Sequence, residues 1–482
     1  MSKCPYTTDA AGHPLDDQNA ALRAGSTGPL VVDPRLYEHN AIFNRERIPE
    51  RVVHANGAGA FGTFRVTKDV SQYTKASFLS SVGKETKIAA RFSTVAGERG
   101  FADADRDVRG FGVRFYTDEG NFDLVGNNTP IFFVRDPNKF QDFIHSQKRN
   151  PQTDLRDWEA RWDFWSLSPE SVHQVLILMS DRGVPRTYRH EHGYGSHTFS
   201  LINDKDERVW CKWHMRTNQG YETLAEEEAQ KVRGANPDSH KDDLFHAIER
   251  GEYPSWKVCL QIMTDEQAKK MDFDIFDLTK VWSHKEFPLI EVGEMTLNRN
   301  PQNYFAEVEQ LALSPGNLVP GIGASPDPML QIRLIAYTDA ANYRLGVNHY
   351  QLPVNAPVCP VSHKKYRDGL MNPSANSGGH PNYQPNSMDK YPTFKEGSWE
   401  PPLPLDQAVV QRKRQGQPDD VYFQPRALFQ MFEKDHKERV YKNVAGTMKG
   451  IKQEIIERQL EVFGKVDAEL EQGIRVALEQ EA

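Results

Sequence analysis

The sequence predicts an α+β protein in which an antiparallel β-sheet or barrel is followed by a helical C-terminal part. Short runs of β-branched and aromatic residues recur along the chain, at 61–66, 87–93, 111–116, 131–134, 197–202, 208–215 and 256–263. Turn residues separate several of these runs, which is typical of antiparallel strands joined by hairpins. After residue 421 the apolar positions recur at helical spacing instead.

Four parts follow from this pattern. Residues 1–55 are polar and rich in turn formers, so they predict an N-terminal arm. Residues 56–300 carry the strand-like runs with helical inserts, and residues 421–482 carry the C-terminal helical domain. Residues 301–420 predict a wrapping segment that also carries one helix. Its later part holds ten of the thirty prolines and six aromatic residues. Because disordered segments are poor in aromatics, we expect it to cover a neighbouring surface, as in an interlocked oligomer.

Composition narrows the classes of partner. Of the 482 residues, 38% are hydrophobic and 26% are charged, which suits a globular protein. The net charge of -8 argues against a nucleic-acid partner, whose binding surface is usually basic. No apolar run is long enough to span a membrane, and the N-terminus has no apolar signal segment. The four cysteines form no CxxC pair, which favours free thiols in a reducing compartment. We therefore expect a cytoplasmic protein.

One predicted helix has residues with a chemical meaning. Asp327 can cap its start, Pro328 suits its first position, and Gly346 is a plausible end. Arg333 and Tyr337 are four residues apart, so they share one helical face. A nearby guanidinium favours the phenolate form of a tyrosine, and a tyrosine oxygen is one of the few axial ligands of haem iron. The spacing alone leaves an ordinary surface contact open as the alternative.

Three further segments are distinctive, and with the 333–346 segment they identify a family. They are Phe-Asn-Arg-Glu-Arg-Ile-Pro-Glu-Arg-Val-Val-His-Ala-Asn-Gly-Ala-Gly-Ala-Phe-Gly at 43–62, Arg-Phe-Ser-Thr-Val-Ala-Gly at 91–97, and Phe-Asp-Leu-Val-Gly-Asn-Asn-Thr-Pro-Ile-Phe-Phe-Val-Arg-Asp at 122–136. Together the four segments closely resemble the haem-containing monofunctional catalases, and the resemblance runs from about residue 25 to 475. The chain length resembles the small-subunit type.

This resemblance implies the catalase fold, with an antiparallel eight-stranded β-barrel as its core. It implies a haem b cofactor, meaning ferric protoporphyrin IX, and hydrogen peroxide as the substrate. The implied reaction is disproportionation of peroxide to water and dioxygen, which would protect the cell from peroxide. The resemblance also implies a homotetramer with exchanged N-terminal arms.

Roles carry over residue by residue. The resemblance implies that His54 is the distal acid–base residue, that Ser93 hydrogen-bonds its ring, and that Asn127 orients the peroxide. Tyr337 is implied to be the iron ligand. The residues implied to hold the haem are Arg51, Val53, Arg91, Phe132, Phe140, Arg333 and Arg344.

Further residues are implied around this site. Val95 and Asp107 resemble residues that line the access channel of the family. His197 and Asp327 resemble the two residues that lie behind the arginine beside the iron ligand.

A second cofactor site is implied for NADPH, which many small-subunit catalases bind on the barrel surface. The matching positions are His173, Ser180, Arg182, Arg216, Val281, Trp282 and His284. Ile177 and His192 replace the usual Phe and Asn there. No GxGxxG motif occurs, so this site would not be of the Rossmann type.

The chain departs from the family around the proximal helix. Ile335 and Ala336 stand where Phe and Ser are usual, and Ala340, Ala341 and Asn342 replace a polar, often basic stretch. The departures affect packing at the haem edge, whereas the iron ligand and both nearby arginines are retained.

Other functions stay open at this point. One is a haem peroxidase or an allene-oxide-synthase-like enzyme on the same fold. Another is a protein that stores haem or NADPH without turnover, although storage needs no acid–base group such as His54. A purely structural oligomer is disfavoured, because it would leave the arginines of these motifs without partners.

Overall fold

The computed structural model describes residues 5–26, 28–30, 32–359, 368–388, 400–403 and 419–481. The chain divides into two compact units, Met1–Glu50 and Arg51–Ala482. The first unit contains helix α1 (Pro34–Phe43), which the Asp33 side chain caps by accepting from the backbone N–H groups of Arg35 and Leu36. The second unit contains the sheet and all the other described helices.

The sheet of the second unit closes into a barrel. Its strands are β1 (Gly57–Val66), β2 (Glu85–Thr94), β3 (Arg109–Thr117), β4 (Gly120–Asn127), β5 (Gly193–Tyr194), β6 (Phe199–Ile202), β7 (Arg208–Thr217), β8 (Ser255–Met263), β9 (Ile290–Arg299) and β10 (Ile322–Gly323). The order is β10-β6-β7-β5-β4-β3-β2-β1-β9-β8, all pairs are antiparallel, and a further β7–β8 pairing closes the ring.

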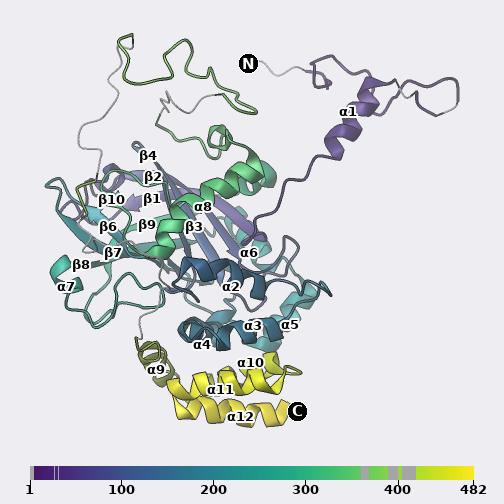
Figure 1. The fold of residues 1–482 in the computed structure, drawn as a ribbon. Helices are drawn as coiled ribbons and strands as arrows, with labels where there is room; N and C mark the ends of the chain where they lie inside the picture. Colours follow the sequence, from purple (N-terminus) through teal and green to yellow (C-terminus); the bar gives the residue numbers. More distant parts are fainter. Residues whose placement is uncertain are drawn as a thin grey trace. The chain divides into compact units, whose positions relative to one another are not determined.

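Although ten strands are named, the closed ring counts as eight-stranded. β5 and β6 both pair with β7, at residues 214–215 and 208–211 respectively, so they are two parts of one interrupted strand. β10 extends the sheet beside β6 only. The described residues therefore form a closed eight-stranded antiparallel barrel, which confirms the predicted fold class (Figure 1).

The barrel interior is the main hydrophobic core. Alternate residues of a strand point to opposite faces. On β2 and β3, Phe92 and Phe111 point inward and are fully buried in that core. Their neighbours Arg91, Ser93 and Gly110 therefore belong to the outer face of the wall.

Helices and shorter turns surround the barrel. The remaining α-helices are α2 (Phe140–Gln147), α3 (Trp158–Ser166), α4 (Val172–Met179), α5 (Glu226–Ala235), α6 (Ser239–Glu249), α7 (Asp265–Ala268), α8 (Pro328–Leu345), α9 (Phe423–Gln430), α10 (Lys434–Met448), α11 (Gln453–Val466) and α12 (Ala468–Glu481). The shorter helices are Ser77–Leu79, Pro137–Lys139, Pro169–Ser171, Asp181–Gly183, Tyr188–His190, His349–Gln351 and the π-helix Phe305–Glu309. The C-terminal helices α9, α10 and α11 pack on α3 and α4 around a second core that contains Trp162 and Trp165, and α12 packs on α10 and α11 (Figure 1).

One strand prediction was wrong. Residues 131–134 form no strand, although the run is strongly apolar. Ile131, Phe133 and Val134 are all buried, and Phe133 packs in the second core against Phe143 and Trp165. In the sequence, an apolar run without regular structure that is buried on all sides looks like a buried strand, because hydrophobic periodicity does not distinguish them.

The predicted helix at 327–346 is confirmed. The Asp327 side chain accepts from the N–H groups of Met329 (2.8 Å) and Leu330 (3.2 Å), and Pro328 is the first helical residue. The helix ends at Gly346, whose φ of 93° lies in the left-handed region. The four-part division stays a prediction, and 360–367, 389–399 and 404–418 of the predicted wrapping segment lie outside the described residues. Among the described residues, no helix is both long enough and apolar enough to cross a membrane.

Candidate functional site

Ser93, Gly110 and Asn127 lie side by side on the outer face of the barrel. Ser93 on β2 pairs with Gly110 on β3, and Gly110 pairs with Asn127 on β4. Paired residues of adjacent antiparallel strands share a face, so Ser93 and Asn127 flank a glycine on the same side of the sheet. The register thus brings two of the three predicted distal residues together.

His54 reaches this face from the segment before β1. Its Nδ1 lies 2.9 Å from Ser93 Oγ, and its backbone N–H donates to the carbonyl of Val95 at 3.1 Å. The φ of His54 is 63°, a left-handed conformation that is uncommon outside glycine and is found at functional sites. The backbone at His54 is therefore locally strained, and this conformation positions the imidazole.

Gly110 makes room for the pair of side chains. A Cβ at this position would stand 2.4 Å from His54 Nδ1 and 2.4 Å from Ser93 Oγ, which is well inside contact distance. Sequence reasoning missed Gly110. The only signal for it was a glycine inside a strand, which can mark a close approach of another group.

The surroundings of His54 favour its neutral form. Burial, together with the positive charges of Arg91 and Arg333, lowers the pKa of His54 to about 3. At neutral pH the ring is therefore uncharged, so one of its nitrogens has a lone pair that can accept a proton.

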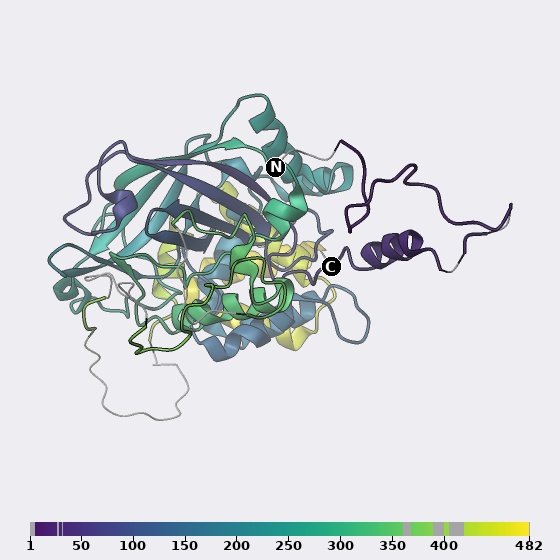
Figure 2. The ribbon, with the colours of Figure 1, turned by 90° about the horizontal axis from the view of Figure 1, so that it is seen from above.

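On the other side of the site, α8 contributes a connected set of polar groups. Arg333 Nη2 donates to Tyr337 Oη at 2.7 Å and to the carbonyl of Val125 at 3.0 Å. Val125 lies two residues before Asn127 on β4, so both belong to the same face of the strand. α8 therefore lies against the outer wall of the barrel, beside the row that contains Asn127 (Figure 1 and Figure 2).

Arg333 is itself held by a buried pair. Its Nη1 lies 2.7 Å from His197 Nε2, and His197 Nδ1 lies 2.5 Å from Asp327 Oδ2. A guanidinium can only donate, so Nε2 accepts and Nδ1 carries the proton that is donated to Asp327. Burial lowers the pKa of His197, in agreement with a neutral ring in this position. Asp327 thus caps α8 and orients His197 with one carboxylate.

Three arginines converge near the same wall. Arg51 Nη2 donates to the carbonyls of Val308 (3.0 Å), Glu309 (2.9 Å) and Leu311 (2.9 Å). Arg344 Nη2 lies 3.1 Å from Glu309 Oε1. Arg51 Nη1 lies 3.9 Å from the same Glu309 oxygen, so the guanidinium groups of Arg51 and Arg344 are close together. Burial lowers the pKa of Arg51, and repulsion from Arg91 and Arg344 acts in the same direction.

Two protein-family models match this sequence. The family model described as catalase matches residues 8–390, and a model described as catalase-related immune-responsive matches residues 415–478. The chain belongs to the catalase family. It is therefore an enzyme, an oxidoreductase that acts on peroxide, and members of this family bind haem.

Similar proteins span the whole chain. A catalase of the Onchocerca volvulus endobacterium is 54% identical, and catalase A of Pseudomonas putida is 52% identical, each over 479 residues and 99% of both chains. Among solved structures, a bacterial catalase matches with a TM-score of 0.95 at 45% identity, covering 100% of this chain and 97% of its own. Catalase A from Saccharomyces cerevisiae matches with a TM-score of 0.93 at 43% identity, covering 98% and 99%.

The residues of this chain fit the haem of a catalase. A haem has two negatively charged propionates, and Arg51, Arg91 and Arg344 bring positive charge to this wall. Within the part of the chain that the structure describes, Glu309 pairs with Arg51 and Arg344. Among the described residues, Arg51 Nη1 and Arg91 Nε are buried and make no hydrogen bond. Buried guanidinium nitrogens without acceptors are costly, and propionate oxygens would satisfy them. Sequence reasoning missed Glu309, for which the sequence offers no signal.

Apolar side chains border the distal side. Phe132 stacks on Phe140 with ring centroids 6.1 Å apart, and both pack against the second core. Val53, Val95 and Asp107 line one small cavity beside them. Asp107 Oδ2 accepts from the N–H groups of Val95 (2.8 Å) and Ala96 (2.7 Å), which fixes this wall of the cavity.

The positions that depart from the family differ in exposure. Ile335 and Ala336 are exposed on α8, as are Ala340 and Asn342, whereas Ala341 is buried. The hydrogen bonds of Arg333 and Arg344 are formed with these residues in place.

Only some of the residues predicted to bind NADPH lie close together. Arg182 Nη2 and Arg216 Nη1 both donate to Tyr194 Oη at 3.3 Å, so these two cations lie together. Ser180 Oγ accepts from the backbone N–H of Arg182, and His284 is exposed near Arg216.

The other predicted nucleotide positions contact neighbouring parts of the protein. His173 is buried and its Nδ1 lies 3.0 Å from the carbonyl of Thr279, while Trp282 is 2% exposed. The backbone N–H of Val281 donates to the Gln424 side chain of α9 at 2.9 Å.

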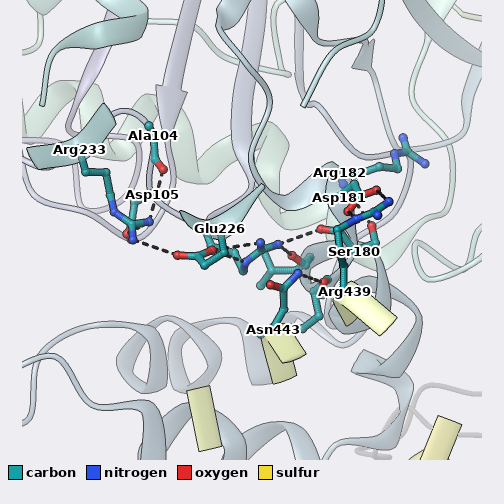
Figure 3. A network of polar contacts seen from close by, with 12 residues as sticks. Ala104, Asp105, Ser180, Asp181, Arg182, Glu226, Arg233, Arg439 and Asn443 are labelled. Carbon is teal, nitrogen blue, oxygen red and sulfur yellow. Dashed lines mark hydrogen bonds and ion pairs between the residues drawn. The ribbon is translucent and has the colours of Figure 1, made fainter. Parts of the chain in front are cut away.

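The loop that carries Ser180 and Arg182 is anchored from below. Figure 3 shows Asp181 facing Arg439 of α10, and the two Arg439 nitrogens lie 2.8 and 2.6 Å from its carboxylate oxygens. The same view shows the Arg182 side chain extending away from that network. The ion pair therefore holds the loop while leaving the Arg182 guanidinium directed elsewhere, toward Tyr194.

Proposed function

We propose that this chain is a haem b catalase that disproportionates hydrogen peroxide to water and dioxygen. Tyr337 would hold the iron, and His54 and Asn127 would act on the peroxide. The observation that carries the proposal is the arrangement on β4, where Arg333 links Tyr337 to Val125, two residues from Asn127. The His54–Ser93 pair lies in the same row of the barrel wall.

The residues divide the work of proton transfer and orientation. A haem bound here would supply the redox chemistry of the reaction. We assign Nδ1–H of His54 as the donor to Ser93 Oγ, which leaves Nε2 to take a proton from one peroxide oxygen and return it to the other. The Asn127 amide orients the peroxide. Val53, Phe132 and Phe140 keep the pocket apolar and limit access of water.

On the proximal side, Arg333 stabilises the anionic form of the Tyr337 oxygen by donating a charge-assisted hydrogen bond. Arg51, Arg91 and Arg344 hold the propionates.

The finer aspects of the function are part of the same proposal. NADPH binds at the surface near Arg182 and Arg216, whose cations suit its phosphate groups. The protein is a cytoplasmic small-subunit homotetramer that protects the cell from peroxide. Exchanged N-terminal arms are supported by the exposed apolar side chains of α1, Tyr37 (72% exposed) and Phe43 (70%), which a second copy would cover.

One experiment tests the function directly. The purified protein should show the Soret band of a haem and should release one dioxygen for every two peroxides consumed, measured with an oxygen electrode. A peroxidase would consume peroxide with a reducing co-substrate and without this stoichiometry. A storage protein would bind haem without turnover. Either outcome would contradict the proposal.

A further inference from the structure

A buried lysine lies behind the proximal side of the site. Lys212 is on β7 between Cys211 and Trp213, which both point into the barrel core, so its own side chain belongs to the outer face. It is nevertheless only 6% exposed. An ammonium group is rarely buried without a defined partner, so its contacts indicate what it stabilises.

Lys212 contacts the turn at Ser196. Its Nζ donates to the carbonyl of Ser196 at 2.8 Å and lies 5.5 Å from the centre of the Trp282 ring. Burial, partly opposed by the negative charges of Asp327 and Asp277, lowers the pKa of Lys212 to about 8. The lysine therefore interacts with Asp327 through space and with Ser196 directly.

Ser196 belongs to the interruption between β5 and β6. Its φ is 62°, a left-handed conformation in which a serine is strained. The carbonyl accepts from Lys212, the Ser196 hydroxyl donates to the carbonyl of Thr129 at 3.2 Å, and the next N–H, of His197, donates to Gly195 at 2.7 Å. These bonds hold the turn, and the turn sets the direction of the His197 ring.

His197 transmits this position to α8. Its ring accepts from Arg333, and Arg333 donates to the Tyr337 oxygen. One chain of contacts therefore runs from Lys212 through Ser196, His197 and Arg333 to Tyr337.

We infer that Lys212 is a positioning residue for the iron ligand, because its ammonium group fixes the Ser196–His197 turn and thereby the hydrogen bond that the Tyr337 oxygen accepts from Arg333. The inference rests on the proposed role of Tyr337 as ligand. Lys212 acts only through the turn and through its charge.

The direction of the effect follows from two causes that agree. Without Lys212 the turn loosens and Arg333 donates less strongly, so the Tyr337 oxygen gives more electron density to the iron. Removal of a buried positive charge also favours the more positive, ferric state. Both causes lower the reduction potential of the ferric–ferrous couple.

The test compares two buried lysines in the haem-loaded protein. Lys212→Met removes the charge and the donor while keeping a long apolar side chain. Lys280→Met is the matched control, because Lys280 is also buried (2% exposed) but its ammonium faces Asp419 and the Asp420 carbonyl. Spectroelectrochemical titration should give a lower potential for Lys212→Met than for the wild type and for Lys280→Met. Equal potentials in the two variants would overturn the inference.

Two milder variants keep the test decisive if Lys212→Met does not fold. Lys212→Arg retains a cation and should keep the wild-type potential, whereas Lys212→Gln retains a donor without charge and should lie below it. Identical potentials in these two variants would overturn the inference. Tyr337→Phe examines the proposed ligand separately: a haem spectrum unchanged by that substitution would contradict the role of Tyr337, whatever the lysine variants show.

Discussion

Arg333 Nη2 lies 2.7 Å from the hydroxyl oxygen of Tyr337, one turn further along α8. The same guanidinium also contacts His197 and the carbonyl of Val125, so it connects the helix to the barrel wall. A flat group with five donors can make these contacts together, and an ammonium group cannot. The relationship makes Arg333 the natural place to begin testing the site.

Arg333→Lys should lower kcat about tenfold to hundredfold. One lysine cannot keep the bonds to His197 and Tyr337 at once, and a hydrogen bond to a charged group contributes about 1.5–3 kcal/mol. The haem spectrum should also shift, because the oxygen ligand loses its donor. Arg65→Lys, an exposed position on β1, serves as control and should leave both readouts unchanged. Full activity in Arg333→Lys would show that the contact does not matter for turnover.

His54→Ala should nearly abolish dioxygen release while haem stays bound. A positioned acid–base group contributes roughly 10²- to 10⁴-fold to a rate, and the arginines that hold the propionates are not altered. The measurement is the initial rate at an oxygen electrode, with the Soret absorbance as a check on haem content. His246→Ala removes an exposed histidine of α6 and should retain the wild-type rate. Normal turnover in His54→Ala would refute the proposed role.

Gly110→Ala should impair catalysis through a single methyl group. The added Cβ would meet His54 Nδ1 and Ser93 Oγ at 2.4 Å, so the pair must move apart. We expect a loss of kcat and a destabilisation of about 1–3 kcal/mol, as for other overpacked sites. In Gly446→Ala, on α10, the added methyl meets nothing within 4 Å, and we expect no loss of activity. An unchanged kcat in Gly110→Ala would contradict the close packing of the pair.

Stability should fall in mild acid. Burial lowers the pKa values of His54, His214 and His240 to about 3 and that of His173 to about 4. In the unfolded chain each of these histidines binds a proton near pH 6.5, so the unfolded state gains protons first as the pH falls. The folded protein therefore keeps its full stability above about pH 6.5 and loses it progressively below, by about 2 kcal/mol for each histidine at pH 5.

Guanidinium unfolding curves at pH 7.5, 6 and 5 measure this loss. The catalytic rate behaves differently, because His54 stays neutral throughout this range. We expect kcat to change little between pH 5 and 8 as long as the protein remains folded. A rate that falls with an apparent pKa near 6.5 would mean that His54 titrates normally and is not shielded as its surroundings imply.

Much of the fold could be predicted from the residues alone. The strands at 61–66, 87–93, 111–116, 208–215 and 256–263 were recognisable because β-branched and aromatic runs are short and separated by turn formers. The helix at α8 was recognisable because its ends carry Asp327, Pro328 and Gly346. The run at 131–134 was misjudged, since an apolar segment buried in the second core has the composition of a strand.

The sequence by itself determined which chemical groups are available, namely the imidazole of His54, the phenol of Tyr337 and the arginines of the motifs. The tertiary structure decided which of them meet. Ser93, Gly110 and Asn127 form one row only through the register of three strands, and a slip by one residue would turn Ser93 into the core. Glu309 acquires Arg51 and Arg344 from distant segments of the chain, and Lys212 acquires Ser196 from the interruption before β6; no local pattern encodes these contacts.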